Sequence, residues 1–132
     1  MNVLVDTSVW SLALRRDAAS APDVALLARA LKMGDTVLTT GLILQELLQG
    51  FEGPMASNQI MRHFAVLPFI TPDVQDHVEA AKLRNLCRRK GVQVGTIDAL
   101  IAQLCIRHEL QLLSTDRNFK HIARHVPLVL LV

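Results

Sequence analysis

The sequence has 132 residues, of which 51% are hydrophobic and 20% charged, with a formal net charge of +2. This length and composition suit one domain with a buried core; they exclude a disordered chain and a strong field of a single sign. No apolar run approaches the roughly 20 residues of a membrane helix, and no basic segment of a signal peptide opens the chain. We therefore expect one domain over residues 1–132, soluble and cytoplasmic, with no membrane partner.

Short apolar runs alternate with longer amphipathic ones along the chain. In chain order they predict a strand over 2–6, helices over 8–17 and 23–34, a strand over 35–40, helices over 42–50 and 57–67, a strand over 68–70, helices over 71–91 and 95–109, a strand over 110–116, a helix over 117–125 and a strand over 127–132. Thr71 is the expected N-cap of its helix, with Pro72 in the first turn. The alternation predicts an α/β fold, a three-layer α/β/α sandwich with a mostly parallel central sheet.

Four acidic residues lie among apolar neighbours where predicted strands end or helices begin. Asp6 and Asp116 each end a predicted strand, so both are expected at the same edge of the sheet. Asp98 falls in the first turn of a predicted helix, and Glu46 lies among leucines on the helix that leaves the second strand. Ligands of open α/β sheets bind at this edge, which makes the four acids a candidate site.

A cluster of carboxylates needs a proton or a cation. Two such groups about 4 Å apart repel by about 4 kcal/mol at an effective dielectric constant of 20. Carboxylate oxygens with water suit Mg²⁺ or Mn²⁺, which can activate a water and neutralise charge on a phosphodiester. Four hydroxyls are placed to orient carboxylates or waters around such an ion: Thr7, Ser8, Ser114 and Thr115.

Each acid also has an ordinary explanation. Asp98 favours the dipole of its helix, Asp116 is placed to cap the next helix, and Glu46 suits a solvated position. These explanations must bring four acids to one edge by coincidence, whereas a site accounts for all of them together.

The motifs that carry these acids resemble the PIN-domain ribonucleases, in particular the VapC-type toxins of toxin–antitoxin pairs. The matching stretches are "VLVDTSVW", Glu46 in "ILQELLQG", "TIDALIA" and "LLSTDRNF". The resemblance implies a PIN-like fold and an endoribonuclease that uses Mg²⁺ or Mn²⁺ to cleave cellular RNA such as tRNA, rRNA or mRNA. It assigns catalysis and metal binding to Asp6, Glu46, Asp98 and Asp116. It also implies a homodimer held inactive by a small cognate antitoxin protein.

The chain departs from that family's pattern at two positions. Ser114 stands where members often have threonine, and the hydroxyl is retained. Asn118 stands where many members have a further acid, so we place it beside the metal rather than among its ligands.

Basic residues cluster in two places. Arg117, Lys120 and Arg124 follow Asp116 and are candidate contacts to RNA phosphates, or a solvated face. The run "RNLCRRKG" over 84–91 ends a predicted helix, where binding RNA and complementing the helix dipole are both open interpretations.

An apolar surface is the expected docking site of the antitoxin, as a groove that an amphipathic peptide fills. We place it on the helix of Trp10, Leu12 and Leu14 and on the stretches around the following residues, for which core packing is the alternative: Leu47, Phe51, Ile60 and Phe64.

Two other functions compete with the nuclease. One is a non-catalytic PIN-like module that binds RNA or protein, which the loss of one acid would favour. The other is a receiver-like domain with an acidic pocket, which usually adds a lysine at its last strand; no lysine lies near these strand ends. All four acids are present, so the enzyme is the preferred interpretation.

Overall fold

The structure is a computed structural model that describes residues 1–15 and 21–132. Its elements are β1 (Asn2–Val5), α1 (Thr7–Ala13), α2 (Pro22–Lys32), β2 (Thr36–Thr40), α3 (Gly41–Gly50), α4 (Pro54–Phe64), β3 (Phe69–Ile70), α5 (Val74–Arg89), α6 (Thr96–Arg107), β4 (Gln111–Leu113), α7 (Asn118–Ile122) and β5 (Val129–Leu130). This order of strands and helices confirms the predicted one. The end of the predicted helix over 8–17 lies partly outside the described residues.

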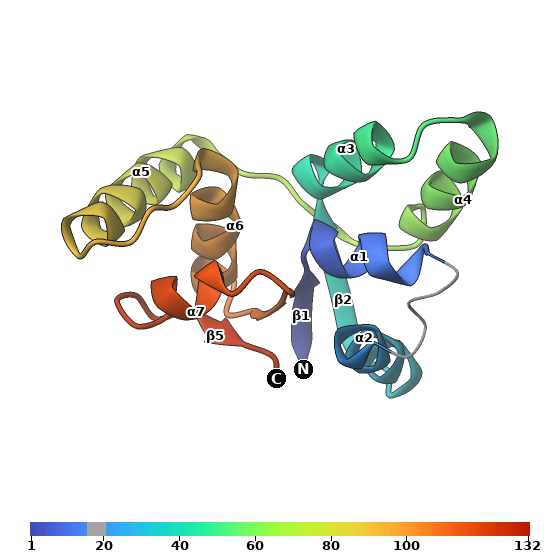
Figure 1. Cartoon of the computed structure of the whole chain (residues 1–132), viewed down its shortest axis with the longest axis horizontal. Helices are drawn as coiled ribbons and strands as arrows, with labels where there is room; N and C mark the ends of the chain where they lie inside the picture. The colour runs from blue at the N-terminus through green and yellow to red at the C-terminus, as the bar shows by residue number, and fades with distance from the viewer. Residues whose placement is uncertain (16–20) are drawn as a thin grey trace.

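The strands form one five-stranded sheet in the order β3-β2-β1-β4-β5, and every recorded pairing is parallel. Helices lie on both sides of it, with α1 to α4 on one side of β1 in the view of Figure 1 and α5 to α7 on the other. The predicted three-layer α/β/α architecture is therefore confirmed.

Strand β1 is the centre of the molecule. Val3, Leu4 and Val5 are fully buried, because β1 has a neighbouring strand on each side and helices over both faces. From β1 the chain first builds outward through β2 and β3, and later returns to add β4 and β5 on the other side. The strand order thus reverses between β1 and β4, and the carboxyl ends of two such strands form the usual ligand crevice of an open parallel sheet.

Several boundaries differ from the sequence prediction. The expected Thr71 cap is wrong, since α5 begins after Asp73, which exchanges two hydrogen bonds of 2.9 Å with Asp76 in a capping box. Such reciprocal capping satisfies two free N–H groups, which a threonine ahead of Pro72 does not. Strand β4 ends at Leu113, so Asp116 lies in the turn beyond the strand rather than at its last position.

No helix among the described residues is long and apolar enough to cross a bilayer. Cys87 and Cys105 are both buried and both free.

A buried ion pair joins α5 to α6. Asp76 is 1% exposed, and its Oδ2 accepts a 2.7 Å bond from Arg107, which also lies 3.1 Å from Asp73. The pKa of Asp73 lies below its ordinary value, chiefly because the Asp76 backbone N–H donates to it, with Arg107 adding to the effect. The capping box and the arginine together fix the start of α5 against the end of α6.

We expect Asp76→Ala to lower the free energy of unfolding by about 2 kcal/mol, because it removes half of the capping box and the buried partner of Arg107. Chemical denaturation measures the loss. Glu79→Ala on the same helix is the matched control, since Glu79 makes only exposed contacts and should change stability by less than about 0.5 kcal/mol. Equal effects of the two substitutions would contradict this account.

Candidate active site

Asp6 joins the ends of β1 and β4. Its backbone N–H donates to Leu113 at 2.9 Å, which extends the pairing of the two strands by one residue. Its carboxylate is 9% exposed, and Oδ2 accepts hydrogen bonds from Ser8 at 2.9 Å and Ser114 at 2.8 Å. A carboxylate this buried requires such bonds. The two serines, which are far apart in sequence, therefore fix its position.

The same two hydroxyls organise the turn after β4. They lie 3.3 Å apart, and Ser8 also accepts the backbone N–H of Thr115 at 3.1 Å. Ser114 accepts the backbone N–H of Asp116 at 3.0 Å. Asp116 is itself exposed, and its Oδ1 accepts the backbone N–H of Asn118 at 2.9 Å. One oxygen of Asp116 thus supports the start of α7, in the capping manner that the sequence left open.

Glu46 reaches the site from α3. That helix starts directly after β2, where the Thr40 hydroxyl accepts the backbone N–H of Leu42 at 3.1 Å. Glu46 is half-buried, and its Oε1 accepts a 2.8 Å bond from the Thr7 hydroxyl. Thr7 directly follows Asp6 and begins α1, so the start of this helix contacts two carboxylates: Thr7 donates to Glu46, and Ser8 donates to Asp6.

Asp98 lies in the first turn of α6 and is half-buried. Its pKa is raised from 3.8 to about 6, first by burial and then by the negative charges of Asp6, Asp116 and Glu46. The structure thus brings the other three carboxylates close enough to Asp98 for their charges to affect it, although Asp98 lies at a helix start that favours negative charge. About two turns further along α6, burial and the charge of Asp6 also raise the pKa of Cys105.

No positively charged side chain among the described residues pairs with these four carboxylates. Among residues 1–15 and 21–132, none of the four carboxylates forms a salt bridge with lysine, arginine or histidine. Within the same residues, no three acidic, histidine or cysteine side chains stand close enough to hold an ion directly. Mg²⁺ commonly keeps several waters and uses one or two carboxylates, so this widely spaced, hydroxyl-supported set of oxygens fits a hydrated ion rather than a fully dehydrated one.

The hydroxyl and amide groups predicted to support the site fall into two groups. Thr7, Ser8 and Ser114 bond to site carboxylates. Thr115 contributes its backbone N–H, and Asn118 turns its side-chain amide away to the Gln93 carbonyl at 2.7 Å. Sequence reasoning missed this link to Gln93, because no local pattern marks a contact between distant loops.

The basic residues after Asp116 lie at the rim of the site. Arg117, Lys120 and Arg124 are all exposed on or beside α7. None of them has a carboxylate partner in the part of the chain that the structure describes. Their contact with RNA stays a prediction.

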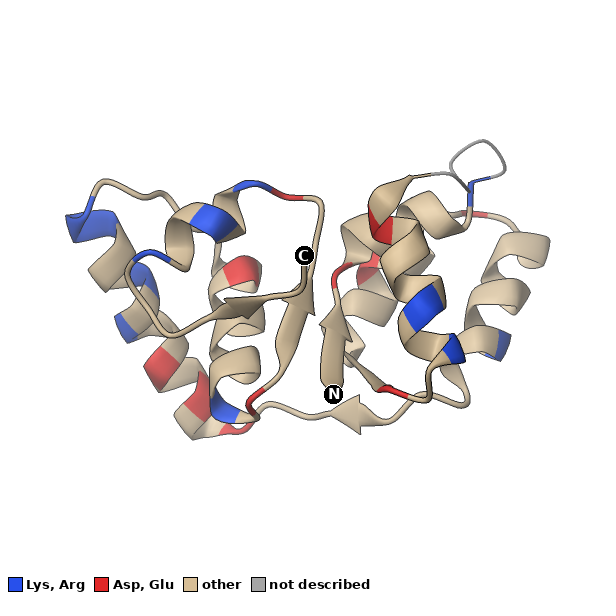
Figure 2. Ribbon diagram, turned by 90° about the horizontal axis from the view of Figure 1, so that it is seen from below, with Lys and Arg blue, Asp and Glu red and all other residues tan. Residues whose placement is uncertain are grey.

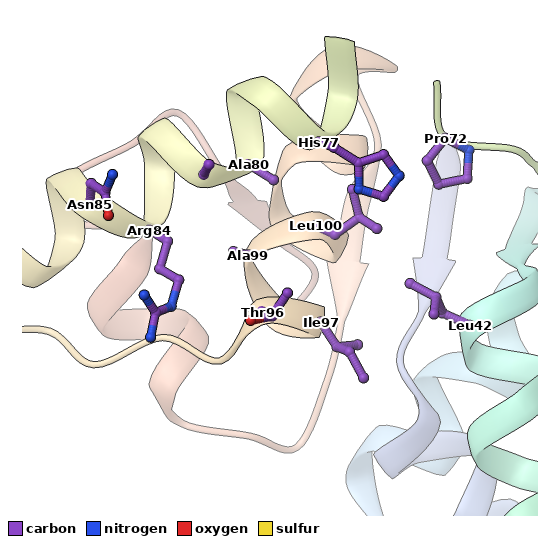
Figure 3. A pocket seen from close by; sticks show the side chains of 11 residues that line it. Leu42, Pro72, His77, Ala80, Arg84, Asn85, Thr96, Ile97, Ala99 and Leu100 are labelled. Atoms are coloured by element: carbon purple, nitrogen blue, oxygen red, sulfur yellow. The ribbon is translucent and has the colours of Figure 1, made fainter. Parts of the chain in front are cut away.

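An apolar hollow of about 600 Å³ lies beside the first turn of α6 (Figure 3). Leu42 of α3 borders one side, Ala80 of α5 another, and Ile97 and Leu100 line it from α6. None of the four acids lines this hollow. This hollow is therefore a neighbour of the acidic cluster and not the cluster itself.

Solved structures of several bacterial complexes share this fold. VapBC2 from Rickettsia felis, bound to a promoter DNA fragment, aligns with a TM-score of 0.76 at 20% identity, covering 99% of this chain and 98% of that one. VapBC-1 from nontypeable Haemophilus influenzae gives 0.77 at 17% identity, with coverages of 99% and 97%. Mycobacterium tuberculosis VapC20, described as a sarcin-ricin loop cleaving toxin, gives 0.67 at 20% identity, with coverages of 94% and 96%.

Sequence comparison gives a consistent answer. No curated protein sequence matches the chain. The family described as the PIN domain matches residues 3–125, which include all four acids. The resemblance seen in the motifs is therefore confirmed, and the receiver-like alternative is set aside: this chain belongs to the PIN domain family.

Proposed function

We propose that this protein is a metal-dependent endoribonuclease, the toxin of a toxin–antitoxin pair, which cleaves cellular RNA such as tRNA, rRNA or mRNA. The observation that carries the proposal is the gathering of negative charge around Asp98, whose pKa is raised first by burial and then by three neighbouring carboxylates. Such a cluster lowers stability without a cation, so a cation-binding role explains it better than a structural one does. Membership of the PIN domain family and the description of VapC20 as an RNA-cleaving toxin support the same proposal.

In this proposal Asp6, Glu46, Asp98 and Asp116 hold Mg²⁺ or Mn²⁺. The bound ion supplies a water of lowered pKa and neutralises charge on the phosphodiester. Ser8 and Ser114 keep Asp6 in one orientation, and Thr7 does the same for Glu46. No side chain needs to form a covalent bond with RNA, because water is the nucleophile.

Asp6→Asn and Asp98→Asn should each abolish RNA cleavage while the fold persists, because each removes charge and keeps shape. Wild-type cleavage should require Mg²⁺ or Mn²⁺, stop with EDTA, and proceed weakly or not at all with Ca²⁺, which accepts looser geometry. Gel assays on total cellular RNA with purified protein measure this. Glu79→Gln, an exposed acid on α5, is the control and should cleave at the wild-type rate.

Two results would separate the alternatives. Cleavage by the Asp98→Asn variant at the wild-type rate would contradict the metal-nuclease proposal. RNA binding without any cleavage, in the presence of metal, would favour the non-catalytic PIN-like module.

The raised pKa of Asp98 predicts how stability depends on pH. An acid that keeps its proton to about pH 6 in the folded state, against 3.8 ordinarily, binds more protons when folded. Without metal, the free energy of unfolding should therefore fall as pH rises between about 4 and 6. Thermal unfolding in EDTA measures this.

Asp98→Asn should remove most of this fall and raise the melting temperature at pH 7 more than at pH 4. Added Mg²⁺ should reduce the same fall in the wild-type protein, since a bound cation favours the ionised carboxylate. A wild-type curve that is flat over this range would refute the assignment.

The proposal includes a small antitoxin partner, as in the VapBC complexes that share the fold. An apolar hollow of about 330 Å³ runs between α1, α2 and α4. The rings of Trp10 and Phe64 lie 5.1 Å apart on one of its walls. Of the residues predicted for this surface, Trp10, Leu14, Ile60 and Phe64 line the hollow, whereas Leu12, Leu47 and Phe51 do not. Leu27 and Leu31 of α2 line it as well.

Leu31→Lys should weaken antitoxin binding about tenfold or more, because Leu31 is a half-exposed apolar residue in this hollow. Co-purification with the product of the neighbouring small reading frame, followed by titration, measures the change. Val74→Lys, an exposed apolar position on α5, is the control.

We also propose that the protein forms a homodimer, which light scattering of the isolated toxin tests. A monomer that does not bind the product of the neighbouring reading frame would contradict both the homodimer and the antitoxin partner, and would leave the catalytic proposal intact.

A further inference from the structure

A basic hollow lies between the end of α5 and the segment that leads into α6. Its volume is about 580 Å³, and its lining is Arg84, Arg88, Gln93, Val94 and Gly95. Gly91, with a φ of 82°, lets the chain turn back after α5, and only two residues separate Gly95 from Asp98. The hollow is thus adjacent in the chain to the acidic cluster, but no acid lines it.

Arg84 is held in place at the edge of this hollow. It is half-buried, and its Nε donates a 2.8 Å hydrogen bond to the Val94 carbonyl. Figure 3 shows the side chain reaching from α5 toward the segment that enters α6. The bond uses one donor of the guanidinium and fixes its plane, while its terminal nitrogens form no salt bridge within residues 1–15 and 21–132. A fixed planar fork with free donors suits a phosphate group.

Arg88 adds a second positive charge one helical turn later. It is exposed, and no carboxylate pairs with it among the residues described. Like charges at this spacing on one helix face are destabilising by about 0.2–0.5 kcal/mol. Gly95 on the opposite wall precedes α6 and gives its first N–H groups no side-chain cap. Two of the residues that line the hollow are therefore arginines without a carboxylate partner in the described structure, and a third is the glycine at the uncapped N-terminus of α6.

Two connections join the hollow to the site acids. The Gln93 carbonyl accepts the Asn118 side-chain amide at 2.7 Å, and the Asn118 backbone N–H donates to Asp116 at 2.9 Å. Gly95 leads into the turn of α6 that carries Asp98. In Figure 2, lysines and arginines of α7 and of the end of α5 lie on the same side of the molecule. A chain of phosphates leaving the acids in this direction approaches the basic residues of α7 and of the end of α5.

We propose that the Arg84–Arg88 hollow binds a backbone phosphate of the RNA substrate, next along the strand from the phosphodiester that is cleaved. This inference rests on the proposed ribonuclease function and names where the substrate strand runs. Arg84 and Arg88 are positioning residues: they hold RNA and do not touch the reacting atoms. The hollow recognises phosphate and not base, so it contributes affinity without sequence preference.

The test is binding of fluorescein-labelled oligouridine in EDTA, measured by anisotropy over a range of KCl concentrations. The Arg84→Gln/Arg88→Gln double variant should bind about tenfold more weakly, as expected when charged hydrogen bonds to one phosphate are lost. The slope of log K against log [KCl] should become shallower by about 0.7 for each phosphate released. In metal-dependent cleavage, KM should rise and kcat should stay the same.

The control carries the same charge change on the other side of the molecule. Arg29→Gln/Arg62→Gln alters two exposed arginines of α2 and α4 and should leave affinity, slope and KM near the wild type. Arg88→Gln alone guards against misfolding, because Arg88 makes no side-chain hydrogen bond in the described structure. It should lower affinity and slope, and Arg88→Lys should restore the slope.

The outcomes distinguish this inference from the function on which it rests. If wild-type protein binds and cleaves RNA while the double variant behaves like the control, the hollow is not a phosphate site and the ribonuclease remains. If kcat falls with KM unchanged, the arginines act on the reacting geometry and the inference is wrong. If the wild-type protein neither binds nor cleaves RNA, the proposed function itself fails.

Discussion

The whole site depends on placing a carboxylate that is nine-tenths buried at the point where the strand order of the sheet reverses. Asp6 is tolerated there because Ser8 and Ser114 both donate to one of its oxygens. Ser8 lies in the first turn of α1, just after β1, and Ser114 follows β4, so the bonds that satisfy the charge also join the ends of the two strands. The same two segments carry Thr7, which donates to Glu46, and Asp116, whose backbone N–H donates to Ser114. Fold and site are consequences of the same contacts.

A second buried aspartate in the same chain shows what a structural carboxylate looks like. Asp76 lies beside Arg107, at 2.7 Å, and shares a capping box with Asp73. Its charge is balanced inside the protein. Asp6, Glu46 and Asp116 accept hydrogen bonds from hydroxyl or backbone donors, but none of the four acids has a cationic partner within the described residues. Burial and the charges of the other three acids raise the pKa of Asp98. The four site acids lower local stability, whereas the Asp76–Arg107 pair and its capping box do not. Such a local cost in stability is the usual sign of a functional site.

Local sequence patterns predicted most of the fold but none of the long-range side-chain contacts. Alternating apolar runs were enough to predict the order of strands and helices, because short apolar runs suit buried strands and longer runs with a helical repeat suit helices. The Thr71 cap was wrong because the reciprocal bonds between Asp73 and Asp76, which start the helix two residues later, appear only in three dimensions. The acids could be named because strand ends fall on one edge of a parallel sheet. The link from Asn118 to Gln93 joins two loops separated by a helix and a strand, and no sequence spacing reveals it.

The acidic cluster also divides the molecule into two surfaces of different chemistry. On one side α1, α2 and α4 enclose the apolar hollow around Trp10, and on the other the end of α5 and α7 present unpaired arginines and lysines. Helix α1 begins at Thr7, directly after Asp6, and ends at Ala13, so Trp10 and the residues that hold the acids belong to one short helix. A peptide that packs against Trp10 therefore contacts the element that positions Glu46 and Asp6. The basic hollow is joined to the acids through Asn118 and Gln93 instead, so under the proposed function RNA and antitoxin would reach the same cluster through separate elements of the fold.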